Sequence, residues 1–156
     1  MSDERTVALS LEQVADYEFR VRFDGSAAPE LTTDESAPLG REAGPDPAQL
    51  QLAAVANCLS SSLLFALRKF KNSPESLRAS AQARMARNQA GRWRIVAIDV
   101  SLSLAEAASV HRNLDRALAQ FEEFCIVTES VRTGIPVRVH VNDSDGALLH
   151  SSADLA

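Results

Sequence analysis

Two cysteines are the side chains best suited to redox chemistry in this chain of 156 residues. Cys58 lies inside a largely apolar stretch, and Cys125 follows much later in the sequence. Two thiols that meet can pass between dithiol and disulfide states, and the thiolate is the reactive form. The spacing does not bring them together, because the chain has no C-x-x-C pair. A redox pair and simple packing of two apolar thiols therefore both stay open at this point.

The N-terminal segment favours a cytoplasmic protein. MSDERTVALSLEQ is acidic and has no basic start followed by an apolar run, so it does not have the layout of a secretory signal. The most apolar stretch, residues 50–70, contains too many polar residues for a membrane span. In a reducing cytoplasm we expect no permanent disulfide staple, and any pairing of the two cysteines should be transient and chemical.

Composition excludes several classes of partner. The 16 Lys and Arg residues are outnumbered by 21 Asp and Glu residues, and a net charge of -5 disfavours nucleic acid and anionic membranes. The histidines, His111, His140 and His150, have no metal-ligand spacing, and we predict that they lie on the surface. We therefore expect no metal and no bound cofactor. Small molecules and proteins remain as partners.

The order of predicted elements indicates an α+β fold. Alternating patterns predict strands, and helical spacing predicts a long helix and a later amphipathic one. There is no βαβ alternation, so the sheets should be mainly antiparallel, in a single domain over 1–156 with an ordered core at about 6–141 and a loose tail at 142–156. The predicted strands are 6–12, 17–24, 30–34, 76–87, 92–104 and 136–141, and the predicted helices are 47–71 and 106–124, with a short helical turn at 128–132.

The helix predicted at 47–71 has clear ends and an unusual surface. Asp46, Pro47 and Gln49 form a capping-box start, and Pro74 follows its basic last turn. Between the two ends, apolar or small residues occupy nearly every direction around the helix. Such a helix must be covered on all sides, which a dimer would achieve; a single curved sheet with a second helix is the alternative.

Two segments together resemble the family of osmotically inducible protein C (OsmC). GPDPAQLQLAAVANCLSSSL resembles the family's Pro-x-x-x-Leu...Ala-Ala...Cys helix, and CIVTESVRTGIPVRV resembles its second-cysteine segment. Both occur in the family order and at a similar separation. The resemblance covers residues from about 6 to 141, and the paired motifs are far more specific than either motif alone.

The resemblance implies an intertwined homodimer and a peroxidase reaction. Two long central helices would pack against antiparallel sheets, and Cys58 would attack the oxygen–oxygen bond of an organic hydroperoxide. The sulfenic acid formed at Cys58 would then be resolved to a disulfide by Cys125. A dithiol or a lipoylated protein would act as the external reductant.

The resemblance also suggests charged partners for the thiols, with one departure. Arg41 resembles the arginine of the loop before the helix, and Arg22 is a weaker match to the N-terminal arginine of the organic hydroperoxide resistance branch. The glutamate that pairs with this arginine in the family is replaced by Ala48, and two alternatives stay open: Glu42 stands in from the loop, or the thiol is less strongly activated. Ile126 also replaces the usual proline. These departures motivate an alternative. The chain would be a divergent OsmC-like protein that binds a small ligand or has a stress-related role, without peroxidase turnover.

Overall fold

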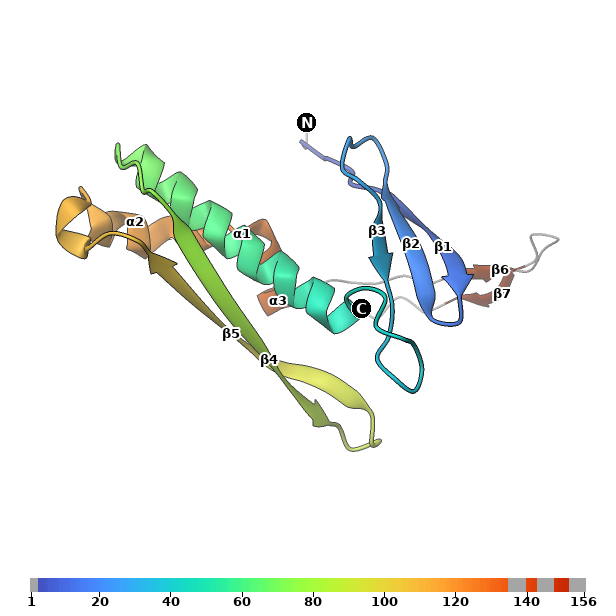
Figure 1. The fold of residues 1–156 in the computed structure, drawn as a ribbon. Helices are drawn as coiled ribbons and strands as arrows, with labels where there is room; N and C mark the ends of the chain where they lie inside the picture. The colour runs from blue at the N-terminus through green and yellow to red at the C-terminus, as the bar shows by residue number, and fades with distance from the viewer. Residues whose placement is uncertain (1–2, 135–139, 143–147, 152–156) are drawn as a thin grey trace. The chain divides into compact units, whose positions relative to one another are not determined.

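The computed structural model describes residues 3–134, 140–142 and 148–151. Within these ranges, strands precede and follow a long helix, and all sheet pairings that are described are antiparallel or hairpin pairings, as an α+β fold requires (Figure 1). The elements are β1 (Leu9–Ala15), β2 (Glu18–Phe23), β3 (Leu31–Thr33), α1 (Pro47–Lys69), β4 (Leu77–Arg87), β5 (Trp93–Leu104), the 3₁₀ turn η1 (Ala108–Val110), α2 (Leu114–Gln120), the 3₁₀ turn η2 (Phe121–Phe124), α3 (Ile126–Thr133), β6 (His140–Asn142) and β7 (Leu148–Ser151).

The first three strands form an antiparallel meander in the order β1-β2-β3. Leu11 pairs with Val21, and Val21 pairs in turn with Leu31. A turn follows β2 at Gly25, which has a positive φ of 68° that glycine adopts without a steric penalty. The first strand begins at Leu9, three residues later than predicted, and its residues are all exposed.

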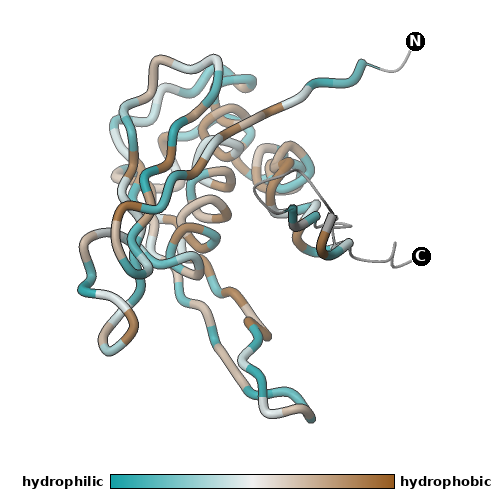
Figure 2. The backbone as a smooth tube through the Cα atoms, turned by 90° about the vertical axis from the view of Figure 1, so that its right-hand side faces the viewer, coloured by the Kyte–Doolittle hydropathy of each residue, from teal (hydrophilic) through white to brown (hydrophobic). Residues whose placement is uncertain are grey.

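The strands predicted at 76–87 and 92–104 are confirmed as β4 and β5, which pair as a two-stranded sheet. Asn88 closes the turn, because its side-chain oxygen accepts the amides of Ala90 and Arg92, each at 3.0 Å. Gly91 has a φ of 75°. Arg87 stacks over the Trp93 ring at 4.5 Å. Figure 2 shows teal, hydrophilic residues toward the turn of this long hairpin.

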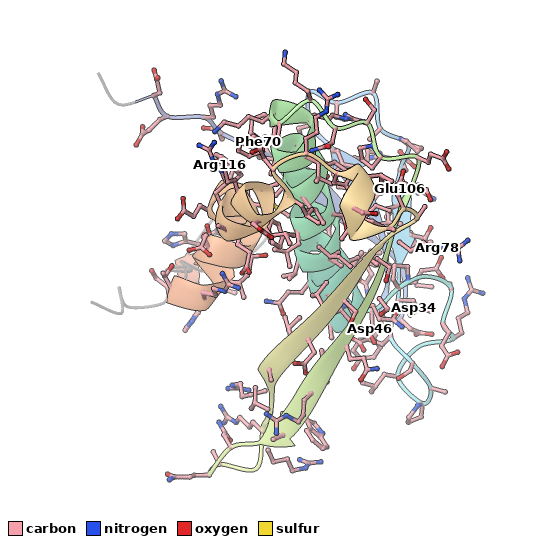
Figure 3. The ribbon with its side chains drawn as sticks, turned by 90° about the vertical axis from the view of Figure 1, so that its left-hand side faces the viewer. Asp34, Asp46, Phe70, Arg78, Glu106 and Arg116 are labelled. Carbon is pink, nitrogen blue, oxygen red and sulfur yellow. The ribbon has the colours of Figure 1, made fainter. Side chains whose placement is uncertain are left out.

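The helix α1 begins as the sequence predicts. Asp46 Oδ1 accepts the amide of Gln49 at 2.7 Å, and Gln49 Oε1 accepts the amide of Asp46 at 2.9 Å, which completes a reciprocal capping box. The figure with side chains shows Asp46 at the start of the helix (Figure 3). By length and composition alone α1 could cross a membrane, but the core helix of a soluble protein passes the same test.

The helix predicted at 106–124 is wrong in its extent. Asn113 has a φ of 48°, in the left-handed region that asparagine tolerates, and it separates η1 from α2. The buried Asn72 fixes this break from outside the segment. Its side chain accepts the amide of Arg112 at 2.7 Å and donates to the carbonyl of Arg112 at 2.9 Å. Helical periodicity does not indicate hydrogen bonds from a residue so far away in the sequence.

The C-terminal half of α1 packs beside α2 and η2. Phe65 meets Phe124 edge to face at a centroid distance of 5.1 Å, and Lys69 Nζ donates to Gln120 at 3.1 Å. Arg116 lies over the Phe70 ring at 5.4 Å, and both are labelled in Figure 3. Buried apolar residues continue this packing inward, namely Leu59, Leu63, Ala66, Leu67 and Ala117.

The tail predicted to be loose contains a strand. Within 142–156, Leu148–Ser151 forms β7 and pairs antiparallel with β6. The strand predicted at 136–141 is described only from His140, and its earlier residues lie outside the described ranges. Residues 148–151 are too few to show a clear alternation of apolar and polar side chains. The sequence pattern therefore does not predict the pairing of β7 with β6.

Contacts within the chain gather into two compact units. One comprises residues 1–57 and 77–103, and the other comprises 58–76 and 104–156, so the boundary crosses α1 between Asn57 and Cys58. Both cysteines belong to the second unit, whereas Arg41 and Glu42 belong to the first. The single domain over 1–156 stays a prediction.

A buried carboxylate organises the loop before α1. Asp34 is only 2% exposed, and its carboxylate accepts the amides of Glu35 at 2.8 Å and of Arg41 and Ala43 at 3.0 Å each. The hydrogen bond from the Ala43 amide is the main cause that lowers the pKa of Asp34, followed by the one from Arg41. Gly40 is needed here, because a Cβ at that position would collide with Asp34 Oδ1.

Replacing the cap of α1 should destabilise the protein. Asp46→Ala removes the acceptor of the Gln49 amide, and we expect a loss of about 1 kcal/mol in the free energy of unfolding. Urea denaturation followed by circular dichroism measures this loss. Asp3→Ala removes a carboxylate from an exposed position and is the matched control. Equal stability of the two variants would contradict the capping box.

Replacing Asp34 should give a destabilisation that depends on pH. Its lowered pKa means that the ionised form stabilises the fold above the ordinary aspartate pKa of about 3.9, and this contribution is lost as pH falls through the lowered value. We therefore expect Asp34→Asn to be less stable than wild type at pH 7, with a gap that narrows below about pH 4. Urea denaturation between pH 7 and 3 measures the gap, with Asp3→Asn as control. A gap that stays constant over this range would contradict the assignment.

Candidate functional site

Cys125 lies at the N-terminal cap of α3. Its sulfur accepts the backbone amide of Thr128 at 3.4 Å, and Thr128 Oγ1 is 2.9 Å from Sγ. The amides of a helix's first turn have no partner within the helix, so an acceptor at the cap satisfies one of them. Cys125 is fully buried, with 0% exposure, and Thr128 is also buried. The sulfur is therefore held in a fixed place by the start of the helix.

The helix α1 brings two side chains to this sulfur. Cys58 and Ser62 are four residues apart, so they lie on the same face of the helix. Each makes a side-chain hydrogen bond with Cys125. The backbone amides of Val127 and Thr128 also donate to the sulfur of Cys58. The structure thus brings the two predicted cysteines into direct contact at the first turn of α3.

Burial acts to raise the pKa of both thiols, but their hydrogen bonds shift the two pKa values in opposite directions. At Cys125, the bonds from Cys58, Thr128 and Ser62 outweigh burial, and the pKa is lowered. At Cys58, burial and the donation of its proton to Cys125 act together, so the pKa is raised although two amides oppose this. The two thiols are in contact, so they titrate as a pair.

The two cysteine residues also differ in their exposure to solvent. Cys58 is partly exposed, whereas Cys125 is enclosed. A molecule arriving from solvent would reach Cys58 first. Cys125 would then react with the oxidised form of Cys58. This difference agrees with the expected order of the reaction, in which Cys58 attacks and Cys125 resolves. The roles themselves stay predictions.

The predicted cations have carboxylate partners. Arg41 Nη2 is 2.6 Å from Glu18 Oε2, and this hydrogen bond is the main cause that raises the pKa of Arg41. Arg22 pairs with Glu30 at 2.5 Å and lies 3.6 Å from Glu12. All of these residues belong to the first unit. An action of Arg41 or Arg22 on the thiols therefore stays a prediction.

Glu42 lies in the loop that Asp34 organises. It has a left-handed φ of 61°, and its amide donates to the carbonyl of Glu35 at 3.2 Å. It lines a pocket of about 380 Å³ with Asp34, Glu35, Ser36, Gly44, Pro45, Asp46 and Gln49, and a second pocket of about 140 Å³ is lined partly by Arg41. Neither cysteine lines these two pockets. In the family a glutamate occupies the position of Ala48 and pairs with the arginine. That Glu42 takes over this role stays a prediction.

Two residues of the site, Thr128 and Ser62, are not among those that the sequence predicts. Thr128 follows Cys125 by three residues, the spacing that lets a cap residue and the third helical residue bond to each other, so this signal was present. Ser62 lies four residues after Cys58, within a run of three serines that gives no reason to prefer one of them. The position of α3 decides which serine contacts Cys125, and that serine is Ser62.

One prediction about the histidines is wrong. The side chain of His111 is 3% exposed, and its Nε2 lies 3.7 Å from Glu106 Oε2. A continuous helix over 106–124 would carry His111 opposite its apolar face, but the break at Asn113 ends that helix. His140 and His150 are exposed, as predicted. Over the part of the chain that is described, no group of three or more metal-ligating side chains gathers.

Comparison with known proteins identifies the fold. A family model described as OsmC-like protein matches residues 40–140. Among curated proteins, no relative matches the sequence. An OsmC-like protein of unknown function from Vibrio cholerae is 16% identical, with a TM-score of 0.65 over 81% of this chain and 94% of that chain.

Two further solved structures share the same fold. The organic hydroperoxide resistance protein OsmC from Legionella pneumophila is 15% identical, with a TM-score of 0.62 over 84% of this chain and 92% of its own. OhrB, the organic hydroperoxide resistance protein of Bacillus subtilis, is 16% identical, with a TM-score of 0.58 over 82% and 91%. These identities establish the fold alone. Because the family model matches more than half of the chain and the fold agrees, this protein belongs to the OsmC-like family.

Proposed function

We propose that this protein is a thiol-dependent peroxidase that reduces organic hydroperoxides with Cys58 and Cys125. The observation that carries the proposal is the hydrogen bond between the two sulfurs. Forming a disulfide from sulfurs already in contact requires only a small approach of α1 and α3, whereas separated cysteines would require rearrangement of the backbone. Membership of the OsmC-like family and the names of the Legionella and Bacillus proteins support the substrate class.

The reaction proceeds in two steps that balance. The sulfur of Cys58 attacks one peroxide oxygen, the oxygen–oxygen bond breaks, and the products are a sulfenic acid at Cys58 and an alcohol. Cys125 then attacks the sulfenic sulfur and releases water, which leaves a disulfide. The peroxide is reduced by two electrons and the pair of thiols is oxidised by two. In the cytoplasm, an external dithiol or a lipoylated protein reduces the disulfide and restores both thiols.

A second copy of this chain is the proposed protein partner. Among the described residues, few large apolar side chains are buried, while Phe65 on α1 is 56% exposed and Leu9 and Leu11 on β1 are each more than half exposed. In the apolar part of α1, 33% of the residues are buried. Ala54 is exposed on the same face of α1 as Phe65. A homodimer would cover this face, which one chain leaves open to water.

The peroxidase proposal is tested with purified protein and cumene hydroperoxide. With dithiothreitol present, we expect wild type to consume the peroxide and Cys58→Ser to fall to the rate of the mixture without protein, because serine does not form a nucleophilic anion at neutral pH. Consumption by Cys58→Ser as fast as by wild type would refute the role of Cys58. The ferrous oxidation–xylenol orange assay measures the remaining peroxide.

Intact mass spectrometry separates the peroxidase from the ligand-binding alternative. After one equivalent of peroxide and no reductant, wild type should lose two hydrogens, a mass change of about -2 Da. Cys125→Ser is the matched variant and should instead gain one oxygen at Cys58, about +16 Da. Unchanged free thiols in wild type would favour the OsmC-like protein that binds a small ligand without turnover.

The homodimer is tested by placing a charge on the exposed face of α1. Ala54→Glu should shift the protein toward monomer in sedimentation velocity, because a buried unpaired carboxylate at an interface is strongly unfavourable. Ala27→Glu adds the same charge in the exposed loop between β2 and β3 and should leave the sedimentation coefficient unchanged. A wild-type protein that sediments as a monomer at all concentrations would contradict the proposal.

A further inference from the structure

The sulfur of Cys125 is held from two helices. On its own helix, the thiol donates to Thr128 Oγ1 at 2.9 Å, and the sulfur accepts the Thr128 amide at 3.4 Å. On α1, the side chains of Cys58 and Ser62 bond the same sulfur. The contacts with Thr128 are local, so they fix the sulfur relative to α3 alone. The distance from this sulfur to Cys58 therefore depends on what connects it with α1.

Oxidation changes one of the two connections with α1. When Cys58 becomes a sulfenic acid, its sulfur carries a hydroxyl group in place of the hydrogen. The hydrogen bond between the two thiols is then no longer the one that the reduced structure shows. The hydroxyl of Ser62 does not react with peroxide, and it stays about one helical turn from Cys58. The connection through Ser62 is thus the one that peroxide leaves unaltered.

We propose that Ser62 is a positioning residue for the resolving step, in which its hydroxyl holds the Cys125 sulfur toward α1 so that this sulfur meets the sulfenic acid at Cys58. This inference rests on the proposed function and extends it, because it assigns a residue outside the cysteine pair to the formation of the disulfide. Ser62 acts through the Cys125 sulfur.

Burial makes the hydrogen bond from Ser62 an effective restraint. Ser62, Thr128 and Cys125 are all buried. A hydroxyl without access to water keeps its protein partner, because an unmade hydrogen bond in a buried place is costly. A cysteine side chain places its sulfur by rotation about one bond, which has three staggered positions. Ser62 and Thr128 together favour the position in which the Cys125 sulfur faces Cys58.

The place of Ser62 on α1 also suits this role. Ser62 follows Cys58 by four residues, so the two side chains lie on one face of the helix. The neighbouring Ser61 is turned by about 100° around the helix axis from Ser62, and it is exposed. Ser61 therefore offers a matched control, with the same hydroxyl on the same helix but in another direction.

Atoms and electrons balance in the resolving step. Cys125 attacks the sulfenic sulfur of Cys58, the sulfur–sulfur bond forms and the sulfur–oxygen bond breaks. The leaving hydroxide takes up the proton of the Cys125 thiol and departs as water. A second molecule of peroxide competes for the same sulfenic acid and oxidises it to a sulfinic acid, with release of a second molecule of alcohol. The yield of sulfinic acid therefore rises with peroxide concentration and falls when resolution is fast.

The experiment measures this competition. Reduced protein is mixed with rising concentrations of cumene hydroperoxide without reductant, and intact mass spectrometry separates the disulfide, about -2 Da, from the sulfinic acid, about +32 Da. The peroxide concentration that gives equal amounts of the two products is the crossover concentration. In Ser62→Ala we expect it to fall about fivefold, the effect of losing one neutral hydrogen bond. Ser61→Ala should leave it unchanged.

The crossover concentration separates positioning from a general disturbance of the site. A change that merely made Cys58 less reactive would slow both reactions that consume the sulfenic acid, whereas a change in the aim of Cys125 slows resolution alone. Ser62→Thr keeps a hydroxyl at the same place and should restore the crossover concentration of wild type. Circular dichroism confirms that each variant has the native helix content under the conditions of the reaction.

The outcomes distinguish the role of Ser62 from the function on which it rests. If wild type forms the disulfide and Ser62→Ala has the crossover concentration of wild type, the inference is overturned and the peroxidase proposal stands. An equal fall in Ser61→Ala, or no recovery in Ser62→Thr, would overturn it as well. If wild type forms neither disulfide nor sulfinic acid at any peroxide concentration, the proposed function itself fails.

Discussion

Packing of the first turn of α3 against the C-terminal half of α1 is the contact on which the site depends. Cys125 is both the cap of α3 and the partner of Cys58, so the helix start and the sulfur contact form together. Contacts on either side hold this arrangement. The edge-to-face pair of Phe65 and Phe124 fixes η2, which directly precedes Cys125. A change that loosened this packing would therefore separate the sulfurs, whereas the local cap between Cys125 and Thr128 would remain.

Neutral hydrogen-bond donors lower the pKa of Cys125 against the effect of burial. A thiolate that is buried and accepts several hydrogen bonds has a lower pKa than burial alone would give, and Cys125 shows this balance. The family resemblance implies a clamp of arginine and glutamate, but the glutamate position holds Ala48, and Arg41 is paired with Glu18. The donors at the cap of α3 act on Cys125, while burial raises the pKa of Cys58.

The exposed apolar surface limits how far one chain can be stable by itself. A domain of this size ordinarily buries about two thirds of the surface that its unfolded chain exposes. Among the described residues, large apolar side chains on α1 and β1 remain open, and Phe65 is an example that also supports the packing beside Cys125. Covering α1 would thus connect assembly of the protein with the stability of the site.

The sequence by itself determined the elements whose signals are local. The capping box of Asp46 and Gln49 marks the start of α1, and alternation marks β2, β4 and β5, because these patterns depend on neighbours in the chain. The motifs around Cys58 and Cys125 identified the family. Tertiary structure decided the rest: Asn72 ends the predicted helix near Asn113, β6 orders part of the predicted tail, and α3 selects Ser62. Whether two thiols that lie far apart in the sequence touch depends on packing between elements, which no local pattern records.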